Sequence, residues 1–418
     1  MKFGFLLIWA AAAVSAGEWP QFRGPDGTGL APDAKPPVTW SEEQNVKWKL
    51  PLPYAGHSSP VVENGIIYFT GASKDKLERR LIAVDAESGR MVFDELIYRV
   101  TSNEVERCHE MNSFATPSPI VQNGRVYLTF GRHGTLCYDA AKRTKVWERR
   151  DLYVDYYDVG PASSPILYKD KLILNCDGAA TNKQYVIAFD TATGRTVWKT
   201  DRSFVSNTVP KYAHASCVPR VIDVEGEPQL VSPGAHGFWV YNPETGEELW
   251  KVRFEGWSTV PYPVFAEKEG VLLVCSGVVR PAMAAVKVSR KLRGDITHSA
   301  AVLWRVEKDV PDMPSPLYYN GNFYLLTKNA LFRRDVMTGA VLDVIKPTGQ
   351  FVSSPVLADG KLFFFARGKQ SYAVEAAPGL AIVGTNRLDA GCQASPSIYK
   401  NSLIVRTADA LYRLEKTQ

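Results

Sequence analysis

Histidine is the side chain of this protein best suited to proton transfer or metal binding near neutral pH, and the chain has six. His57, His109 and His214 each precede a Pro-containing start of an apolar run, while His133 and His236 lie in the tetrapeptides GRHG and GAHG. Such histidines could act as general acids or bases if carboxylates lay beside them. The chain has no HxH or HxxxH spacing, so the sequence does not predict a metal site.

Charged and aromatic residues occupy the same two kinds of segment. The carboxylates are Glu110, Asp158 and Asp312; the cations are Arg132, Arg280, Lys328, Arg367, Lys369 and Arg406; the aromatic residues are Trp257, Tyr212 and Phe351. The cations would favour an anionic ligand, such as an acidic or sulfated glycan or the carboxylates of a quinone. The alternative interpretation is that these groups are solvated turn charges and that the histidines and aromatic rings connect neighbouring loops.

Eight repeated units must position these residues. Each unit starts with a short motif in which Pro is followed by an apolar run. The starts are SSPVV (58–62), PSPIV (117–121), SSPIL (163–167), CVPRV (217–221), PYPVF (261–265), PSPLY (314–318), SSPVL (353–357) and ASPSI (394–398). A repeat of roughly 40 to 60 residues built from short β-runs predicts a β-propeller. The repetition of Ser before Pro indicates a structural role for these serines.

The third unit predicts four strands, in SPIL, KLILNC, YVIAFD and RTVWKT. Its last turn has Asp190 and Gly194, residue types that favour a tight turn with positive φ, and Trp198 follows. Phe93, Trp147 and Trp250 have the same spacing from their own turns. We expect these aromatic rings to pack against the neighbouring blade and not to form a cofactor platform.

The last unit ends without a fourth strand, whereas residues 45–53 (NVKWKLPLP) resemble a fourth strand with Trp48 in the aromatic position. Pairing the two predicts an all-β, eight-bladed propeller with four-stranded blades, closed by the N-terminal strand. Three irregularities are expected: AAKRTK replaces the turn of blade 2, blade 5 has an insertion around residues 287–299, and blades 6 and 7 lack the aromatic residue.

Segments before the first strand of each blade and segments between its second and third strands share one face of a propeller. We therefore expect a ligand site at the mouth of the central channel on that face. The candidate ligand-binding residues are His57, His109, Glu110, Arg132, His133, Asp158, His214, His236, Trp257, Arg280, Asp312 and Arg367.

Residues 1–16 have a basic start, an apolar stretch and small residues at the end, which predicts a signal peptide cleaved after Ala16. No Cys follows it, so a lipid anchor is not expected. Residues 17–44 are rich in Gly and Pro but contain Trp19 and Phe22, and we expect them to form an extended arm docked on one propeller domain, residues 45–418. The mature protein is expected to be periplasmic or secreted, without membrane insertion.

The net charge of +5 over 418 residues is too small to indicate a nucleic-acid partner. The six cysteines form no CxxC, CxxCH or adjacent pair, so neither a metal cluster nor covalently attached haem is expected. Several lie inside apolar β-runs, and we expect mostly buried free thiols.

The SP-start strands, the turn pattern at Ala188 to Trp198 and the N-terminal closing strand resemble those of the pyrroloquinoline-quinone-like (PQQ-like) repeat propellers over about residues 45–418. WPQFRGP (19–25) is similar to the mature N-terminus of an exported bacterial branch of that family. The superfamily includes BamB-type outer-membrane assembly lipoproteins and quinoprotein alcohol dehydrogenases. The dehydrogenases carry an adjacent Cys pair, a Glu/Asn/Asp calcium site and often CxxCH, none of which matches a motif here.

We therefore predict a non-catalytic, monomeric binding or scaffold protein of the bacterial cell envelope that recognises a protein, peptide or glycan and needs no cofactor. The alternative is a PQQ-dependent oxidoreductase that acts on alcohols or sugars and holds the quinone with calcium at the central funnel.

Overall fold

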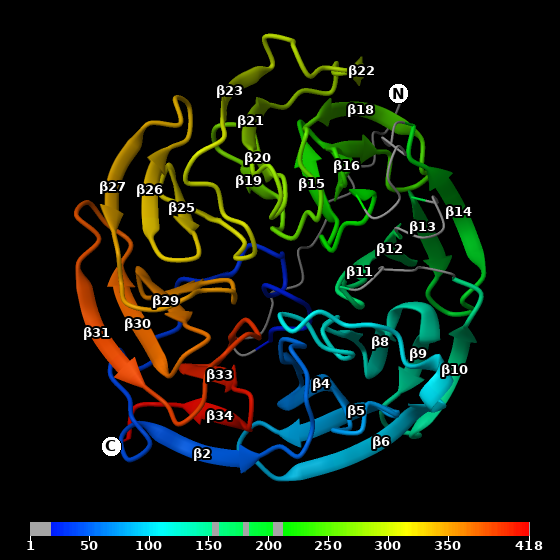
Figure 1. The fold of residues 1–418 in the computed structure, drawn as a ribbon, viewed down its shortest axis with the longest axis vertical. Coiled ribbons are helices and arrows are strands. Elements are labelled where there is room, and N and C mark those ends of the chain that lie inside the picture. The colour runs from blue at the N-terminus through cyan, green and yellow to red at the C-terminus, as the bar shows by residue number, and fades with distance from the viewer. Residues whose placement is uncertain (1–17, 153–158, 179–183, 204–211, 418) are drawn as a thin grey trace, which may run out of the picture.

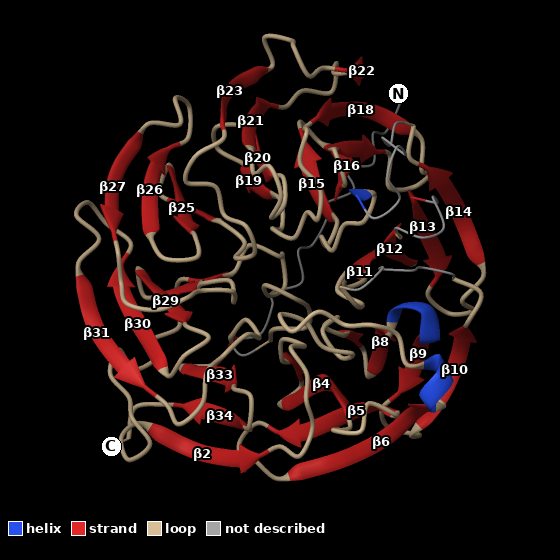
Figure 2. Cartoon of the chain, viewed as in Figure 1, coloured by secondary structure: helices blue, strands red, loops and turns tan. Residues whose placement is uncertain are grey.

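The structure is a computed structural model that describes residues 18–152, 159–178, 184–203 and 212–417. Eight sheets surround a central axis as the blades of a propeller (Figure 1). Figure 2 shows almost only strands, and helix is confined to short turns such as η1 (Ser102–Glu104) and η2 (Gly131–His133). The predicted all-β, eight-bladed propeller is confirmed. The predicted leader, residues 1–16, lies outside the described residues.

The strands follow the chain order around the ring. Blade 1 contains β3 (Val61–Glu63), β4 (Ile66–Ala72), β5 (Glu78–Asp85) and β6 (Met91–Arg99); blade 2 contains β7 (Ile120–Gln122), β8 (Arg125–Thr129), β9 (Thr135–Asp139) and β10 (Thr144–Arg149). Blade 3 contains β11 (Ile166–Tyr168), β12 (Lys171–Asp177), β13 (Gln184–Asp190) and β14 (Thr196–Asp201); blade 4 contains β15 (Arg220–Val224), β16 (Glu227–Gly234), β17 (Gly237–Tyr241), β18 (Glu248–Arg253) and the added β22 (Gly294–Asp295).

The second half of the ring repeats this order. Blade 5 contains β19 (Val264–Ala266), β20 (Val271–Cys275), β21 (Met283–Lys287) and β23 (Val302–Val306); blade 6 contains β24 (Leu317–Tyr319), β25 (Asn322–Leu326), β26 (Leu331–Asp335) and β27 (Val341–Ile345). Blade 7 contains β28 (Val356–Ala358), β29 (Lys361–Phe365), β30 (Gln370–Glu375), β31 (Ile382–Arg387) and the added β1 (Leu30–Ala31); blade 8 contains β32 (Ser397–Tyr399), β33 (Ser402–Arg406), β34 (Ala410–Leu414) and β2 (Val46–Pro51).

The N-terminal strand closes the ring as predicted. β2 pairs antiparallel with β34, so the fourth strand of blade 8 comes from the opposite end of the sequence. Trp48 of β2 donates a hydrogen bond to the carbonyl of Ala86 in blade 1 (3.0 Å). The closing strand therefore links blade 8 to blade 1 through the same kind of contact that joins the other blades.

A tryptophan on the fourth strand of one blade packs on a turn glycine of the next blade. Trp147 lies against Gly194 and Trp198 lies against Gly246, and in each pair a β-carbon on the glycine would come within 2.6 Å of the indole. The Trp147 indole also donates to the carbonyl of Thr191 (2.8 Å). The prediction that these aromatic rings pack between blades is confirmed.

In the irregular blades, other residues cover the aromatic side chain of the fourth strand. In blade 2 the turn glycine is replaced by Arg143, which has φ of 55°, and the facing aromatic residue is Phe93, whose ring lies 5.2 Å from the guanidinium. The blade 5 insertion forms β22, which pairs parallel with β18 beside Trp250. Trp250 is fully buried there and donates to the Gln229 side chain (3.0 Å).

Residues 18–44 pack along the propeller, and in Figure 1 this dark-blue segment crosses the middle of the ring. Trp19 forms a β-bridge with Val62 at the end of β3, and β1 pairs parallel with β28. Trp40 is 3% exposed and stacks on Phe365 with ring centroids 5.7 Å apart. Residues 19–31 contact the first strands β3 and β28 near their ends, so this part of the arm covers the face opposite the segments that precede those strands.

The core lies between blades. One buried cluster, for example, joins Leu81 of blade 1 to Leu128 of blade 2. All six cysteines are free thiols, and five of them are buried, which confirms the expectation drawn from their positions. Within the described ranges, no helix has the length and apolar character needed to cross a bilayer.

Candidate ligand-binding site

A cavity of about 360 Å³ lies on the propeller axis. Residues of all eight blades line it, together with the arm. The described lining includes the residues one and three positions before the repeated prolines. It also includes Phe22, His109, Asn112, His214 and Trp257. Its size is at the lower end of the range of ligand pockets.

The repeated Pro sets the geometry of the cavity wall. In an extended segment, alternate residues point to the same side. The residues one position before Pro, such as Ser59 and Ser118, and three positions before it, such as His57 and Thr116, therefore face the axis. The intervening residues, such as Ser58, point away and are buried in the blades. The cavity wall is thus two stacked rings, one for each of these two positions.

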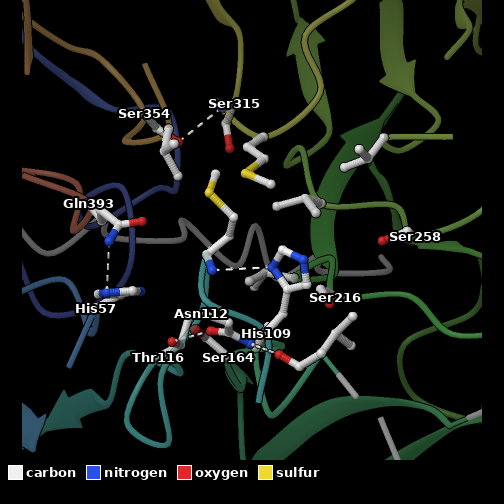
Figure 3. Close-up of a pocket in the computed structure, with 18 of the residues that line it drawn as sticks. His57, His109, Asn112, Thr116, Ser164, Ser216, Ser258, Ser315, Ser354 and Gln393 are labelled. Carbon is white, nitrogen blue, oxygen red and sulfur yellow. Dashed lines mark hydrogen bonds between the residues drawn. The ribbon is translucent and has the colours of Figure 1, made fainter. Parts of the chain in front are cut away.

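The inner ring is a belt of serine hydroxyls. Where neighbouring blades both carry a belt serine, the backbone N–H of one donates to the hydroxyl of the next, as in Ser59 to Ser118 (2.9 Å) and Ser118 to Ser164 (2.9 Å). The belt continues from Ser315 to Ser354 (2.9 Å, Figure 3) and closes from Ser395 back to Ser59 (3.0 Å). The belt supports the structural role inferred for the repeated Ser-Pro motif, because it couples neighbouring blades around the axis.

The belt is interrupted at blades 4 and 5, where Val218 and Tyr262 replace serine. The arm reaches the axis at this interruption. Phe22 packs edge-on against Tyr262 with ring centroids 6.0 Å apart, and the buried Arg23 donates to the carbonyl of Pro316 (2.7 Å). Phe22 therefore forms the floor of the cavity, and the arm closes the channel on that side.

The outer ring has a polar half and an apolar half. Blades 8, 1, 2 and 4 contribute Gln393, His57, Thr116 and Ser216, with Ala162 of blade 3 among them. Blades 5, 6 and 7 contribute Val260, Met313 and Val352. Val278 and Val279, from the loop after β20, extend the apolar half. A ligand that fits this wall has a polar side and an apolar side.

His57 and Gln393 form the strongest polar feature of this wall. The Gln393 amide donates to His57 Nε2 (3.1 Å, Figure 3), so a neutral His57 carries its proton on Nδ1. Burial, with the charges of Arg406 and Arg367 acting in the same direction, lowers the pKa of His57 to about 4. His57 is therefore a neutral hydrogen-bonding group near pH 7 and not a general base poised for catalysis.

The loop between β6 and β7 covers part of the cavity. Its Asn112 donates to the carbonyl of Val159 (2.6 Å) and so connects blade 2 to blade 3. His109 accepts from the backbone N–H of Met111 (3.2 Å), and Figure 3 shows the His109 ring extending into the middle of the pocket. His214 also lines the cavity and is 6% exposed.

The structure brings four of the candidate residues to the cavity: His57, His109, His214 and Trp257. His236 and Tyr212 pack against Trp257, with ring centroids 6.0 and 4.3 Å from it. These three rings form an aromatic group at the rim on the blade 4 and blade 5 side.

The remaining candidates lie away from the cavity wall. His133 is 5% exposed and faces Glu106 (3.7 Å) in the interior of the loops of blades 1 and 2. Arg280 forms an exposed ion pair with Glu255 (2.7 Å), and Glu110 is exposed. Arg132, Asp312 and Arg367 are half-buried outside the lining set, and Asp158 lies outside the described residues.

Several lining residues were not predicted from the sequence. Phe22 was expected only as part of the arm, and Met111 and Asn112 lie in the loop between β6 and β7, outside the motif that starts the blade. Gln393 and Val352 were detectable, because they stand three residues before Pro, as His57 does. The sequence pattern that identifies them is the alternation before each repeated Pro, in which every second residue faces the axis.

The chemistry of the described lining residues does not fit a calcium-bound quinone. Calcium takes six to eight oxygen ligands, mostly carboxylates and carbonyls, and the described lining contains no Asp or Glu. Among the described residues, no three His, Cys, Asp or Glu side chains come together as a metal site would require. The wall instead offers hydroxyl, amide and imidazole groups opposite an apolar surface, which is suited to binding.

Solved structures of low sequence identity share this fold. At such identities the similarity shows the fold alone. A quinohemoprotein alcohol dehydrogenase from Comamonas testosteroni superposes with a TM-score of 0.67 at 13% identity, over 96% of this chain and 81% of that one. BamB from Moraxella catarrhalis gives 0.54 at 12% identity, over 81% and 94%. A europium-containing methanol dehydrogenase gives 0.55 at 12% identity, over 94% and 90%.

A search of the curated proteins gives no match. The protein-family model described as outer membrane protein assembly factor BamB matches residues 42–198 and 182–417, which together span most of the chain. This extent agrees with the repeats and the closing strand described above. The chain therefore belongs to the BamB-like family of PQQ-like repeat β-propellers.

Proposed function

We propose that this protein is a non-catalytic recognition propeller of the bacterial cell envelope, which binds a peptide segment of a protein partner at the cavity face. The observation that carries this proposal is the amphipathic cavity, which loops of all eight blades form and the arm closes from the other side. A blind cavity of this kind receives one end group or one side chain of a larger ligand. The predicted signal peptide supports a periplasmic or secreted location.

A peptide fits the wall better than a glycan does. The apolar half, with Val260, Met313 and Val352, would face sugar hydroxyls without hydrogen-bond partners. An apolar side chain would be buried favourably on the same surface. The aromatic group of Tyr212, His236 and Trp257 at the rim offers further contact area for the rest of the peptide.

A photo-crosslinking experiment tests the proposal. A photoreactive amino acid replaces Val278, which is 39% exposed at the cavity, or Met337, which is 46% exposed in the turn after β26 on the opposite face. Crosslinking in cells that make the protein should give a discrete protein adduct from position 278 and none from position 337. The adduct should weaken when His214 is replaced by Ala.

Adducts from position 337 alone, or from an outer strand position such as Leu342 in β27, would overturn the proposal. These positions match Val278 in apolar character and exposure, since Leu342 is 44% exposed. A result of that kind would place recognition on the blade edges and not at the cavity.

A further inference from the structure

A buried positive charge that no described carboxylate balances lies behind the polar half of the cavity, close enough to His57 to lower its pKa. The guanidinium of Arg406 is 1% exposed and donates to the carbonyls of Ser58 (3.2 Å) and Thr70 (2.8 Å), and its Nη2 has no hydrogen-bond partner. Burial lowers the pKa of Arg406 to about 9, so the group stays charged near pH 7. Among the described residues, no Asp or Glu lies within 4.0 Å of it. An anion placed beside His57 would experience this charge with little solvent screening.

Hydrogen-bond donors for an anion are present at the same place. His57 Nδ1–H has no acceptor among the described residues, since Nε2 takes the Gln393 amide. The hydroxyls of Ser59 and Ser395 accept from the backbone of neighbouring blades, and their own hydrogens have no described acceptor. Three donors therefore lie on one part of the wall, where blades 8 and 1 meet, and a carboxylate can accept from several donors at once.

One acceptor in this group is also unsatisfied. The buried Oε1 of Gln393 has no hydrogen-bond partner. An unpaired buried carbonyl is unfavourable, so a ligand N–H at this position would be favoured. A ligand with a carboxylate and an N–H close together would satisfy both the donors and the acceptor.

The apolar half and the closed floor restrict the rest of the ligand. Val260 of blade 5 lies across the axis from His57 of blade 1, and Met313 and Val352 continue the apolar wall from there to Gln393 of blade 8. Phe22 prevents a chain from passing through the channel. A ligand that enters from the open face must therefore end inside the cavity. The terminal residue of a polypeptide is such a ligand, and a free amino terminus is disfavoured because its positive charge would meet that of Arg406.

We propose that the cavity binds the C-terminal residue of a polypeptide with an apolar side chain. The carboxylate lies on the wall formed by His57, Ser59 and Ser395, and the last backbone N–H donates to Gln393 Oε1. The side chain packs on the apolar wall of blades 5 to 7. Capture of a C-terminal carboxylate is one of the recurring modes of peptide recognition. This inference rests on the proposed function and specifies the ligand of the same site.

Calorimetric titration of the full mature chain tests the inference with four probes: acetyl-Ala-Ala-Leu with a free carboxylate, the same peptide as its C-terminal amide, hexanoate and hexanol. The free-carboxylate peptide should bind at least tenfold more tightly than the amide, and more tightly than hexanoate, which lacks the N–H. NMR of the histidine ring protons should show the titration midpoint of His57 moving upward from about 4 when the carboxylate is bound, because an adjacent anion favours the protonated ring.

Two variants test the contributions of the polar wall and the apolar wall to binding separately. Gln393→Leu should remove most of the preference for the peptide over hexanoate, and Val352→Asn should weaken binding of both. His298→Ala, at an exposed position in the blade 5 insertion, is the control and should change neither. Circular dichroism melting of each variant shows that the fold is retained.

The outcomes distinguish this inference from the proposed function. Equal binding of the carboxylate and the amide, or no binding of any probe while position 278 still crosslinks a protein, would overturn the inference and leave the proposed function standing. Binding of hexanoate in preference to the peptide, with no crosslink from position 278, would overturn both and assign the cavity to free carboxylic acids.

Discussion

The indole ring of Trp198 lies directly against Gly246 of the following blade, and a β-carbon on that glycine would come within 2.6 Å of Trp198 Cε3. The Trp198 Nε1–H donates to the carbonyl of Pro243 in the same turn (3.1 Å). The absence of a side chain at Gly246 is therefore what allows the indole to cover the turn. Trp147 with Gly194, Trp48 with Gly89 and Trp304 with Gly339 repeat the contact around the ring.

Replacing Gly246 by Ala should destabilise the protein strongly. The new methyl group must displace the indole, and the residue must also keep a φ of 75°, which disfavours Ala. We expect a loss of about 2 to 4 kcal/mol in the free energy of unfolding, from backbone strain and overpacking together. Thermal melting of the variant, followed by circular dichroism, measures this effect.

Gly379→Ala is the matched control. Gly379 occupies the equivalent turn of blade 7 with a φ of 85°, but a β-carbon there would have no neighbour within 4 Å, since blade 6 lacks the aromatic residue. It should show only the backbone cost, about 1 to 2 kcal/mol. If the two variants melted at the same temperature, the indole contact would contribute nothing beyond the backbone conformation.

The serine belt predicts a second, separable contribution. Ser118→Ala removes the acceptor for the backbone N–H of Ser59 and leaves a buried donor unpaired between blades 1 and 2. This should cost about 1 to 3 kcal/mol. Ser216→Ala, at a cavity position outside the belt, should cost less than 0.5 kcal/mol, roughly the effect of an ordinary surface change. Equal effects on the melting temperature would show that the belt is not a stabilising element.

The architecture was predictable from the sequence because each blade repeats the same local chemistry. A Pro start, an Asp-to-Gly turn and an aromatic residue recur, and Trp48 before the first full repeat indicates the closing strand. The cavity wall was predictable in principle from the same repeat, since the positions one and three before Pro must face the axis. The candidates His57 and His214, chosen because they precede such starts, do line the cavity.

Other parts of the site depend on contacts that are made once and do not recur from blade to blade. Phe22 reaches the floor because the belt is interrupted at Val218 and Tyr262, and that fit between the arm and blade 5 leaves no pattern along the chain. His133 has the same loop position as His236, yet it is buried beside Glu106 in the interior of its own loops. Neither the floor nor this burial follows from local sequence.

The buried histidines predict a loss of stability in mild acid. Burial lowers the pKa of both His57 and His133 to about 4, with nearby arginine charges acting in the same direction. Because the ordinary value is about 6.5, the unfolded chain takes up protons between pH 6.5 and 4 while the folded chain does not. The contribution of these histidines to the free energy of unfolding should be constant above pH 7. It should decrease as the pH falls from 6.5 to 4, by roughly 3 kcal/mol for His57.

Denaturant unfolding at pH 7.5 and pH 5 measures the effect. A variant with His57→Gln and His133→Gln should lose less stability between the two pH values than the parent protein does. His298→Ala should leave the difference unchanged, because His298 is exposed. An identical pH dependence in the double variant would show that carboxylates alone account for the loss.

Asp177 and Arg202 form an ion pair within blade 3, and the Arg202 guanidinium also reaches blade 4. Both side chains are fully buried, and two hydrogen bonds of 2.5 and 2.6 Å connect them, while Arg202 Nη1 donates to the carbonyl of Ser232 in blade 4 (3.1 Å). Asp177→Asn leaves a buried guanidinium without its counter-charge, which should cost about 3 to 5 kcal/mol. Glu255→Gln, which breaks the exposed pair with Arg280, should cost at most about 1 kcal/mol. The combined variant Asp177→Leu with Arg202→Met should recover part of the lost stability, because it removes both charges. If this variant melted below Asp177→Asn, the contacts of the guanidinium with Ser232 and the Trp239 ring would stabilise the protein more than its pairing with the carboxylate does.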